Sequence, residues 1–190
     1  MTEILKLFEE TGAILEGHFL LSSGRHSPRY VQCALVLQYP DKAQFLGERL
    51  AERFRAAAVD TVIAPAIGGI LVAHEVARAL GARAIFAERR GGRMQLRRGF
   101  DLSPGERVVV VEDVVTTGES MREVVEIALE KKAIVVGLGA ILDRGRAARF
   151  SAGLSLEALL TLDIPLYEPT RCPLCEQGIP LTIPGTRQAQ

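Results

Sequence analysis

Two segments of the chain are apolar without interruption, and they constrain the fold more than any other feature. Val108–Val111 is a run of four valines, and Ala133–Leu142 contains no polar side chain. A strand with one face in water alternates polar and apolar residues, whereas a strand of a parallel sheet is covered by helices on both faces. The chain is therefore predicted to contain a buried parallel sheet.

The segments around these runs alternate between strand and helix patterns. Strands are predicted at Thr61–Pro65, Arg83–Ala87 and Arg107–Val111. A helix is predicted over Ile70–Leu80, and another after Gly118, where apolar residues follow helical spacing at Met121, Val124, Val125, Ala128 and Leu129. The predicted fold class is α/β, a three-layer parallel sheet with flanking helices.

The first sixty residues have a less regular pattern. Ile4, Leu5 and Phe8 predict a short helix that stops at Gly12, and Gly17–Gly24 is predicted to be extended. Tyr30–Leu37 is predicted to be a strand, and a helix is predicted from Pro40 to about Val59.

Length and composition indicate one globular domain spanning residues 1–190, with a packed core, since 48% of the residues are apolar and 24% are charged. Basic and acidic residues both number 23, so no nucleic-acid or membrane partner is expected. No apolar run is long enough to span a bilayer, and no secretory signal begins the chain. Three cysteines are too few for a disulfide framework, and a cytoplasmic location is expected.

The residues after the valine run carry the clearest chemical signal. Val108–Val111 leads into Glu112, Asp113, two valines and then Thr116-Thr117-Gly118-Glu119-Ser120. A helix N-terminus with hydroxyl side chains can bind a phosphate, and carboxylates at the end of a strand can accept bonds from sugar hydroxyls or hold Mg²⁺ through water. The alternative is a capping box between Thr116 and Glu119 beside two solvated acids. The Walker, Gly-x-Gly-x-x-Gly and Gly-x-Ser-x-Gly patterns are absent from the sequence.

This segment resembles the phosphoribosyl pyrophosphate (PRPP) signature of type I phosphoribosyltransferases. Further segments resemble orotate phosphoribosyltransferases: Phe19–Tyr30, the Pro65–Gly69 turn, Asp143-Arg144-Gly145 and Cys172-Pro173-Leu174-Cys175. The resemblance covers most of the chain. It implies a core of residues 40–165 and a small hood formed by residues 1–38 and the C-terminal extension 166–190.

The resemblance also implies the reaction. Ribose 5-phosphate would pass from PRPP to N1 of orotate, giving orotidine 5′-phosphate and pyrophosphate in pyrimidine synthesis, with Mg²⁺ as cofactor. PRPP would bind at Glu112 and Asp113, at Val114–Ser120 (Val114, Val115, Thr116, Thr117, Gly118, Glu119 and Ser120), at the turn Ala66, Ile67, Gly68 and Gly69, and at Arg89 and Arg90. Mg²⁺ would be held mainly by PRPP, with water between it and the two acids. The family often has a non-proline cis peptide in the Ala66–Gly69 turn.

Orotate would bind at Thr116, Arg144, Ser23 and Gly24. The assignment of Arg144 to the carboxylate of orotate also has a physical reason, because the guanidinium fork of an arginine matches a planar carboxylate.

Five arginines lie in the segment from Arg89 to Arg98, around Gly91-Gly92. The segment is predicted to be a loop that closes over the site and brings positive charge to the departing pyrophosphate. Arg89 is the first candidate for this catalytic role and Arg93 the second. Asp113 is the third residue predicted to be catalytic. The resemblance further implies a homodimer in which residues 88–99 reach the neighbouring active site. A solvated basic hairpin is the other interpretation.

Two alternative functions share this PRPP site. A purine phosphoribosyltransferase would not need Arg144 as a carboxylate partner, and a regulator of this fold would sense PRPP or purines without catalysis.

The histidines and the C-terminal cysteines suggest no reaction. His18, His26 and His74 are scattered in the sequence and are interpreted as local hydrogen-bonding residues. Cys172 and Cys175 have half of a zinc-knuckle spacing, with no second pair nearby in the sequence. A reduced structural turn is favoured over a zinc site shared between two copies of the chain.

Overall fold

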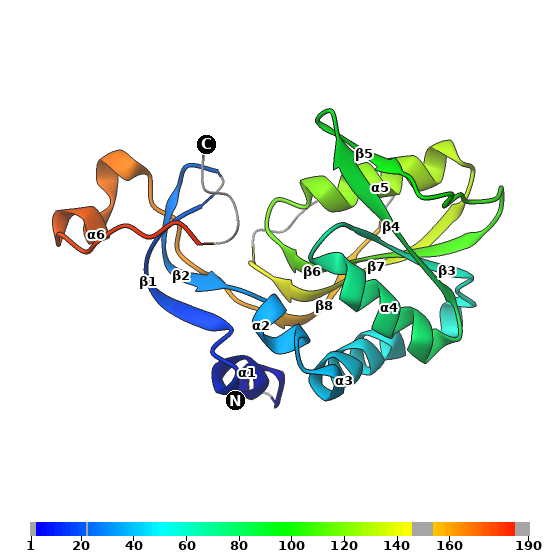
Figure 1. Cartoon of the computed structure of the whole chain (residues 1–190), viewed down its shortest axis with the longest axis horizontal. Helices are drawn as coiled ribbons and strands as arrows, with labels where there is room; N and C mark the ends of the chain where they lie inside the picture. Colours follow the sequence, from blue (N-terminus) through cyan, green and yellow to red (C-terminus); the bar gives the residue numbers. More distant parts are fainter. Residues whose placement is uncertain (1–2, 22, 146–153, 185–190) are drawn as a thin grey trace.

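The computed structural model describes residues 3–21, 23–145 and 154–184, and its centre is one six-stranded sheet (Figure 1). The strand order is β5-β4-β3-β6-β7-β8. The bounds are β3 Thr61–Pro65, β4 Arg83–Arg90, β5 Arg93–Leu96, β6 Arg107–Val115, β7 Ile134–Asp143 and β8 Leu156–Thr161. All neighbours are parallel except β5, which is antiparallel to β4 at the edge. The predicted α/β fold with a parallel sheet is confirmed, with one antiparallel edge strand.

Helices cover both faces of this sheet. Helices α3 (Pro40–Ala51) and α4 (Gly69–Leu80) belong to one core cluster, and α5 (Glu119–Glu130) belongs to the other. The valines of β6 divide between them: Val109 and Val111 belong to the α3–α4 cluster, and Val108 and Val110 to the α5 cluster. The unbroken valine run therefore has the predicted cause, burial on two sides.

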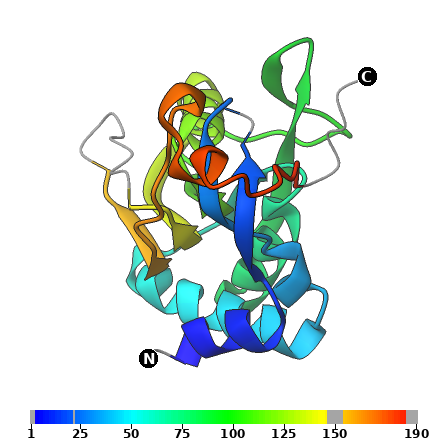
Figure 2. The same cartoon turned by 90° about the vertical axis from the view of Figure 1, so that its left-hand side faces the viewer.

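The N-terminal strands and the C-terminal segment lie side by side next to the core. Helix α1 (Glu3–Glu10) buries Phe8 in the α3–α4 cluster. Strands β1 (Ile14–Leu20) and β2 (His26–Val31) form a separate antiparallel pair. The C-terminal segment 167–183 lies along this pair and contains the short helices η3 (Pro169–Arg171) and α6 (Pro173–Glu176). We call β1, β2 and residues 167–183 the hood; it faces the viewer in Figure 2.

The predicted strand Tyr30–Leu37 is correct only at Tyr30 and Val31. Strand β2 ends at Val31, and Ala34–Leu37 forms the single-turn helix α2. Four consecutive apolar residues fit a buried strand and a buried helical turn equally well. The helical turn is the one that buries Val36 and Leu37 in the α3–α4 cluster. The helix predicted to reach Val59 divides into α3 and the 3₁₀ helix η1 (Glu52–Ala57).

Two predicted strands are longer than expected. Strand β6 continues past the valines to Val115, and β4 continues to Arg90 and turns back as β5. The arginine-rich segment is thus largely a β-hairpin, with Gly91 and Gly92 at positive φ in its turn. Strand β8 was not anticipated. In the part of the chain that the structure describes, no helix has both the length and the apolar character to cross a bilayer.

Candidate active site

The predicted phosphate-binding turn lies between β6 and α5. Thr116 and Thr117 are exposed, and Gly118 takes the left-handed conformation, with φ of 72°, immediately before the helix begins at Glu119. The Thr117 carbonyl accepts a hydrogen bond from Nη2 of Arg122 at 2.6 Å. The turn therefore presents hydroxyls beside a helix N-terminus, which is the environment that binds phosphate. The alternative capping box is wrong, because Gly118 occupies the N-cap position without a side-chain hydrogen bond.

The two acids lie in the last residues of β6 rather than beyond it. Glu112 pairs with Ala140 of β7, and both acids are half-buried. Burial, and then the neighbouring Asp113 charge, raise the pKa of Glu112 to about 8. Burial also raises the pKa of Asp113. Two adjacent carboxyl groups in such an environment favour a ligand that brings positive charge or hydroxyl donors.

The turn after β3 lies directly against Asp113. The peptide bond between Ala66 and Ile67 is cis, as the family resemblance implied, and the Ile67 side chain is 85% exposed. A Cβ atom placed on Gly68 would lie 2.6 Å from each carboxylate oxygen of Asp113. Only glycine allows this approach, and it joins the predicted pyrophosphate turn to the predicted ribose-binding acid.

Arg144 follows β7 and is buried at 7% exposure. Its backbone N–H donates to the carbonyl of Val115 at 3.0 Å, one residue before the phosphate turn. Its Nη2 donates to Oγ of Ser27, in the hood, at 3.3 Å. The predicted carboxylate-binding arginine therefore lies between the end of β6 and the hood.

Two residues near the acids were not predicted as site residues. The pKa of Tyr30 on β2 is raised by burial and then by the charge of Asp113, whereas Arg144 lowers it. The Cys33 thiol donates to the Asp113 carbonyl at 3.8 Å. Tyr30 could have been predicted as a site residue, because it ends the Phe19–Tyr30 segment that resembles the family. Nothing in the sequence indicated that Cys33 lies at the site.

Ser23 and Gly24, the other predicted orotate residues, lie in the exposed turn between β1 and β2. The turn is closed by its own backbone, since the N–H of Gly24 donates to Leu21 and the N–H of Leu21 donates to Arg25, both at 2.9 Å.

The arginines of the β4–β5 hairpin divide into two groups. Arg89 makes a two-pronged ion pair with Glu123 of α5, at 2.5 and 3.2 Å, and also donates to the Gly92 carbonyl. Arg98 pairs in the same way with Glu88, and Arg97 lies 3.9 Å from that carboxylate. Arg89 therefore ties the hairpin to α5, whereas Arg97 and Arg98 join the residues just after β5 to β4 within the same segment.

Arg90 and Arg93 form the second group, at the tip of the hairpin. They are opposite each other in the β-ladder and both are exposed. Within the described residues, neither makes an ion pair. Like charges directly opposite on a ladder repel, so this tip is suited to binding a polyanion.

Comparisons with known proteins agree with this site. The model of the phosphoribosyl transferase domain matches residues 37–153. The chain is 54% identical to the orotate phosphoribosyltransferase of Pelotomaculum thermopropionicum over 98% of this chain and 97% of the relative. It is 52% identical to that of Thermotoga maritima over 97% and 98%. The chain belongs to the orotate phosphoribosyltransferase family.

A solved relative agrees in fold. The crystal structure of orotate phosphoribosyltransferase from Aeropyrum pernix superposes with a TM-score of 0.71 at 30% identity, covering 84% of this chain and 93% of that one. The family assignment suggested by the PRPP signature is therefore confirmed.

Proposed function

We propose that this chain transfers ribose 5-phosphate from PRPP to N1 of orotate, forming orotidine 5′-phosphate and pyrophosphate. The bond from the ribose anomeric carbon to pyrophosphate breaks, and the bond to orotate N1 forms. The observation that carries the proposal is Arg144, a buried arginine whose backbone N–H donates to the carbonyl of Val115, one residue before the phosphate turn, and whose guanidinium donates to Ser27 of the hood. It offers a carboxylate partner beside the PRPP signature, which a purine substrate would not use.

PRPP would be held at three points. The turn from Thr116 to Ser120 would receive the 5-phosphate at the N-terminus of α5. Glu112 and Asp113 would accept hydrogen bonds from the ribose hydroxyls. The pyrophosphate would lie along the Ala66–Gly69 turn, whose Gly68 contacts Asp113. Since the transition state gains positive charge on the ribose, the nearby carboxylates would stabilise it electrostatically.

The donor set at the acids fits a magnesium ion. Glu112 and Asp113 are half-buried carboxyl groups whose pKa values burial raises, and a cation beside them would favour the ionised form, whose oxygens are preferred ligands of Mg²⁺. Mg²⁺ bound with PRPP would neutralise charge on the leaving pyrophosphate. The two acids would hold its hydration shell, and burial would keep bulk water from competing.

The hairpin tip would supply positive charge to the departing pyrophosphate of a neighbouring subunit in a homodimer. Of the arginines predicted from the sequence, Arg89 is paired with Glu123, which favours a role in positioning the hairpin over direct contact with pyrophosphate. Arg93 and Arg90, exposed and opposite each other, are the better candidates for contact with the anion. Dimerisation and a cytoplasmic location remain predictions.

The test is substrate discrimination by the purified protein. With PRPP and Mg²⁺ it should consume orotate, measured as loss of orotate ultraviolet absorbance, and should leave adenine, hypoxanthine and uracil unchanged. Turnover of a purine instead of orotate would transfer the assignment to a purine phosphoribosyltransferase. Tight PRPP binding without turnover of any base would favour a regulator.

A further inference from the structure

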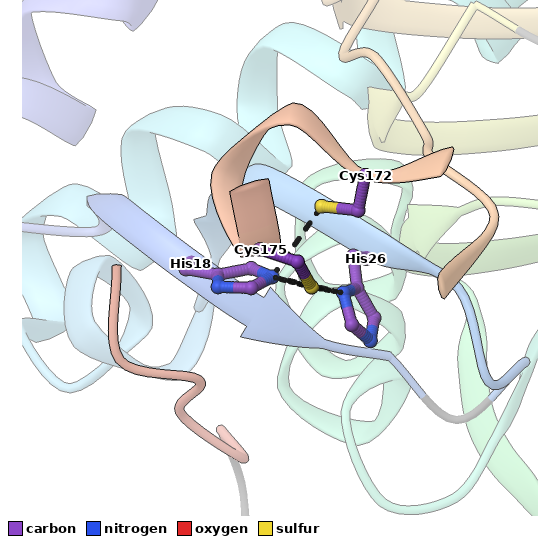
Figure 3. A group of neighbouring side chains, drawn as sticks. All are labelled: His18, His26, Cys172 and Cys175. Atoms are coloured by element: carbon purple, nitrogen blue, oxygen red, sulfur yellow. Dashed lines mark hydrogen bonds between the residues drawn. The ribbon is translucent and has the colours of Figure 1, made fainter. Parts of the chain in front are cut away.

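The hood brings together four side chains that are far apart in the sequence. His18 comes from β1 and His26 begins β2. Cys172 immediately precedes helix α6, and Cys175 lies within it (Figure 3). One nitrogen or sulfur atom of each lies within 4.8 Å of all the others. Two histidines and two cysteines are the donor set of a structural zinc site.

The separations between these atoms match those around a tetrahedral zinc ion. Zn–S bonds of about 2.3 Å and Zn–N bonds of about 2.05 Å place sulfur and nitrogen ligands about 3.6 Å apart. Nε2 of His18 lies 3.5 Å from the sulfur of Cys172 and 3.7 Å from that of Cys175. Nδ1 of His26 lies 3.3 Å from the sulfur of Cys175. The two nitrogens are 2.8 Å apart, against about 3.3 Å expected, so they would have to separate by about half an ångström on binding the ion.

The orientation of His18 suits a metal ligand. Its Nδ1 donates to the carbonyl of Ile179 at 2.7 Å, which in a neutral ring leaves Nε2 unprotonated on the side of the two sulfurs and His26 (Figure 3). Zinc-bound histidines usually donate their second ring N–H to a carbonyl or carboxylate in this way. His18, His26 and Cys172 are at most 5% exposed, and Cys175 is the one exposed member of the group.

Hydrophobic burial alone does not explain how the C-terminal segment is held. In residues 167–183 Cys172 is the only buried residue, and Ile179, Leu181 and Ile183 are exposed. The backbone adds two β-bridges to the hood strands, Phe19 with Thr182 and His26 with Tyr167. Apart from these bridges and the ion pair of Arg25 with Glu168, a metal shared with the hood strands would add a strong attachment to a segment that buries little apolar surface.

We propose that His18, His26, Cys172 and Cys175 bind one Zn²⁺ ion that fastens the C-terminal segment to the β1–β2 pair. The ion would be structural, because four protein ligands fill its tetrahedral shell and leave no position for substrate. Thiolate and imidazole ligands select zinc over the magnesium used with PRPP, which prefers oxygen. The sequence interpretation of a reduced turn and unrelated histidines is replaced by one site.

The site has a consequence for the reaction, and this consequence rests on the proposed function. His26 is adjacent to Ser27, whose Oγ accepts the hydrogen bond from Arg144. The zinc ion would therefore fix the strand that orients the orotate-binding arginine. Loss of zinc should raise the KM for orotate more than the KM for PRPP.

Metal content tests the site independently of catalysis. The wild-type protein, reduced and reconstituted with Zn²⁺ and then gel-filtered, should hold one zinc per chain by elemental analysis. Substitution with Co²⁺ should give thiolate charge-transfer and tetrahedral d–d absorption bands. The variants are Cys175→Ser, whose side chain is exposed and so tolerates replacement, and His18→Ala; His74→Ala, an exposed histidine on α4, is the matched control.

Each ligand variant should lose affinity by more than about 100-fold in competition with a chelator, because loss of an outer-shell partner alone costs about 10- to 100-fold. The His74→Ala control should bind zinc as the wild type does. The proposal is overturned if the reduced wild type retains no zinc, if Cys175→Ser keeps wild-type affinity, or if peptide mass spectrometry finds a Cys172–Cys175 disulfide in protein isolated without oxygen. A protein that binds zinc but does not consume orotate would refute the proposed function and leave the metal site standing.

Discussion

Replacing Glu112 by glutamine should stabilise the ligand-free protein, and increasingly so as the pH rises. Burial raises the pKa of Glu112 from an ordinary 4.5 to about 8. The folded chain therefore retains a proton that the unfolded chain releases, so this carboxyl favours folding in acid, and the contribution is lost as the pH rises from about 4.5 through about 8. Glutamine has nearly the shape of the protonated acid and does not ionise, so the variant escapes this loss.

The size of the effect follows from the two pKa values. From about pH 6 to about pH 8 the folded state holds about one proton more than the unfolded state, and from there to about pH 9 this difference disappears. Over roughly two pH units the wild type therefore loses about 1.36 kcal/mol of stability per unit. The upper limit is therefore about 2.7 kcal/mol. Because the Glu112 side chain is half-buried and solvent screens part of its charge, we expect about 1 to 2.5 kcal/mol.

Urea unfolding of both proteins at several pH values measures this difference. The free energy of unfolding of Glu112→Gln minus that of the wild type should increase steadily across the range. Glu126→Gln, which removes an exposed carboxylate from α5, is the control and should show no comparable trend. A difference that does not change with pH would refute the reasoning, since it would mean that Glu112 is ionised in the folded protein at every pH tested.

Three further predictions concern the site. Arg144→Ala should raise the KM for orotate at least about 10-fold and leave the KM for PRPP nearly unchanged in steady-state kinetics, because the arginine is assigned to one substrate. Gly68→Ala should weaken PRPP binding in calorimetry by about 10-fold or more, because its new Cβ would be forced to within 2.6 Å of both Asp113 oxygens. Subunits carrying Arg90→Ala and Arg93→Ala, mixed with Asp113→Asn subunits, should regain activity well above either parent, because about half of randomly mixed dimers carry one repaired site.

Each of these has an outcome that contradicts it. Equal losses for both substrates in the Arg144 variant would undo its assignment to orotate. Wild-type PRPP affinity in Gly68→Ala would mean that the turn does not need its close contact with Asp113. A verified heterodimer without activity would mean that the hairpin serves its own subunit or that its tip arginines do not contact the anion.

The sequence predicted the features that depend on local pattern. The valine run, the acids after it and the Gly118 turn occupy consecutive positions, so the strand, the turn and the helix could be identified in order. The end of β6 was misjudged because Glu112 and Asp113 resemble a solvated strand end. In the structure, pairing with β7 continues to Val115.

The features that depend on distant contacts were not predicted. Ala34–Leu37 has no periodicity to distinguish strand from helix, and its packing decided the result. The Arg89 ion pair joins β4 to α5 across 34 positions of sequence. The spacing of the two cysteines indicated only two of the four proposed zinc ligands. The other two are histidines more than 145 positions away in the sequence. Spacing along the chain cannot reveal such a set, because the fold brings its members together.

Strand β6 separates the two cores, and this limits how the protein can be engineered. Its valines face α3 and α4 on one side and α5 on the other, and the same strand carries Glu112 and Asp113 at its end. A larger side chain introduced into either core would shift this strand, because closely packed interiors transmit displacement rather than absorb it. Stabilising substitutions are therefore better placed in the outer surfaces of the helices, since a core repacked for heat resistance would move the carboxylates against the Gly68 turn.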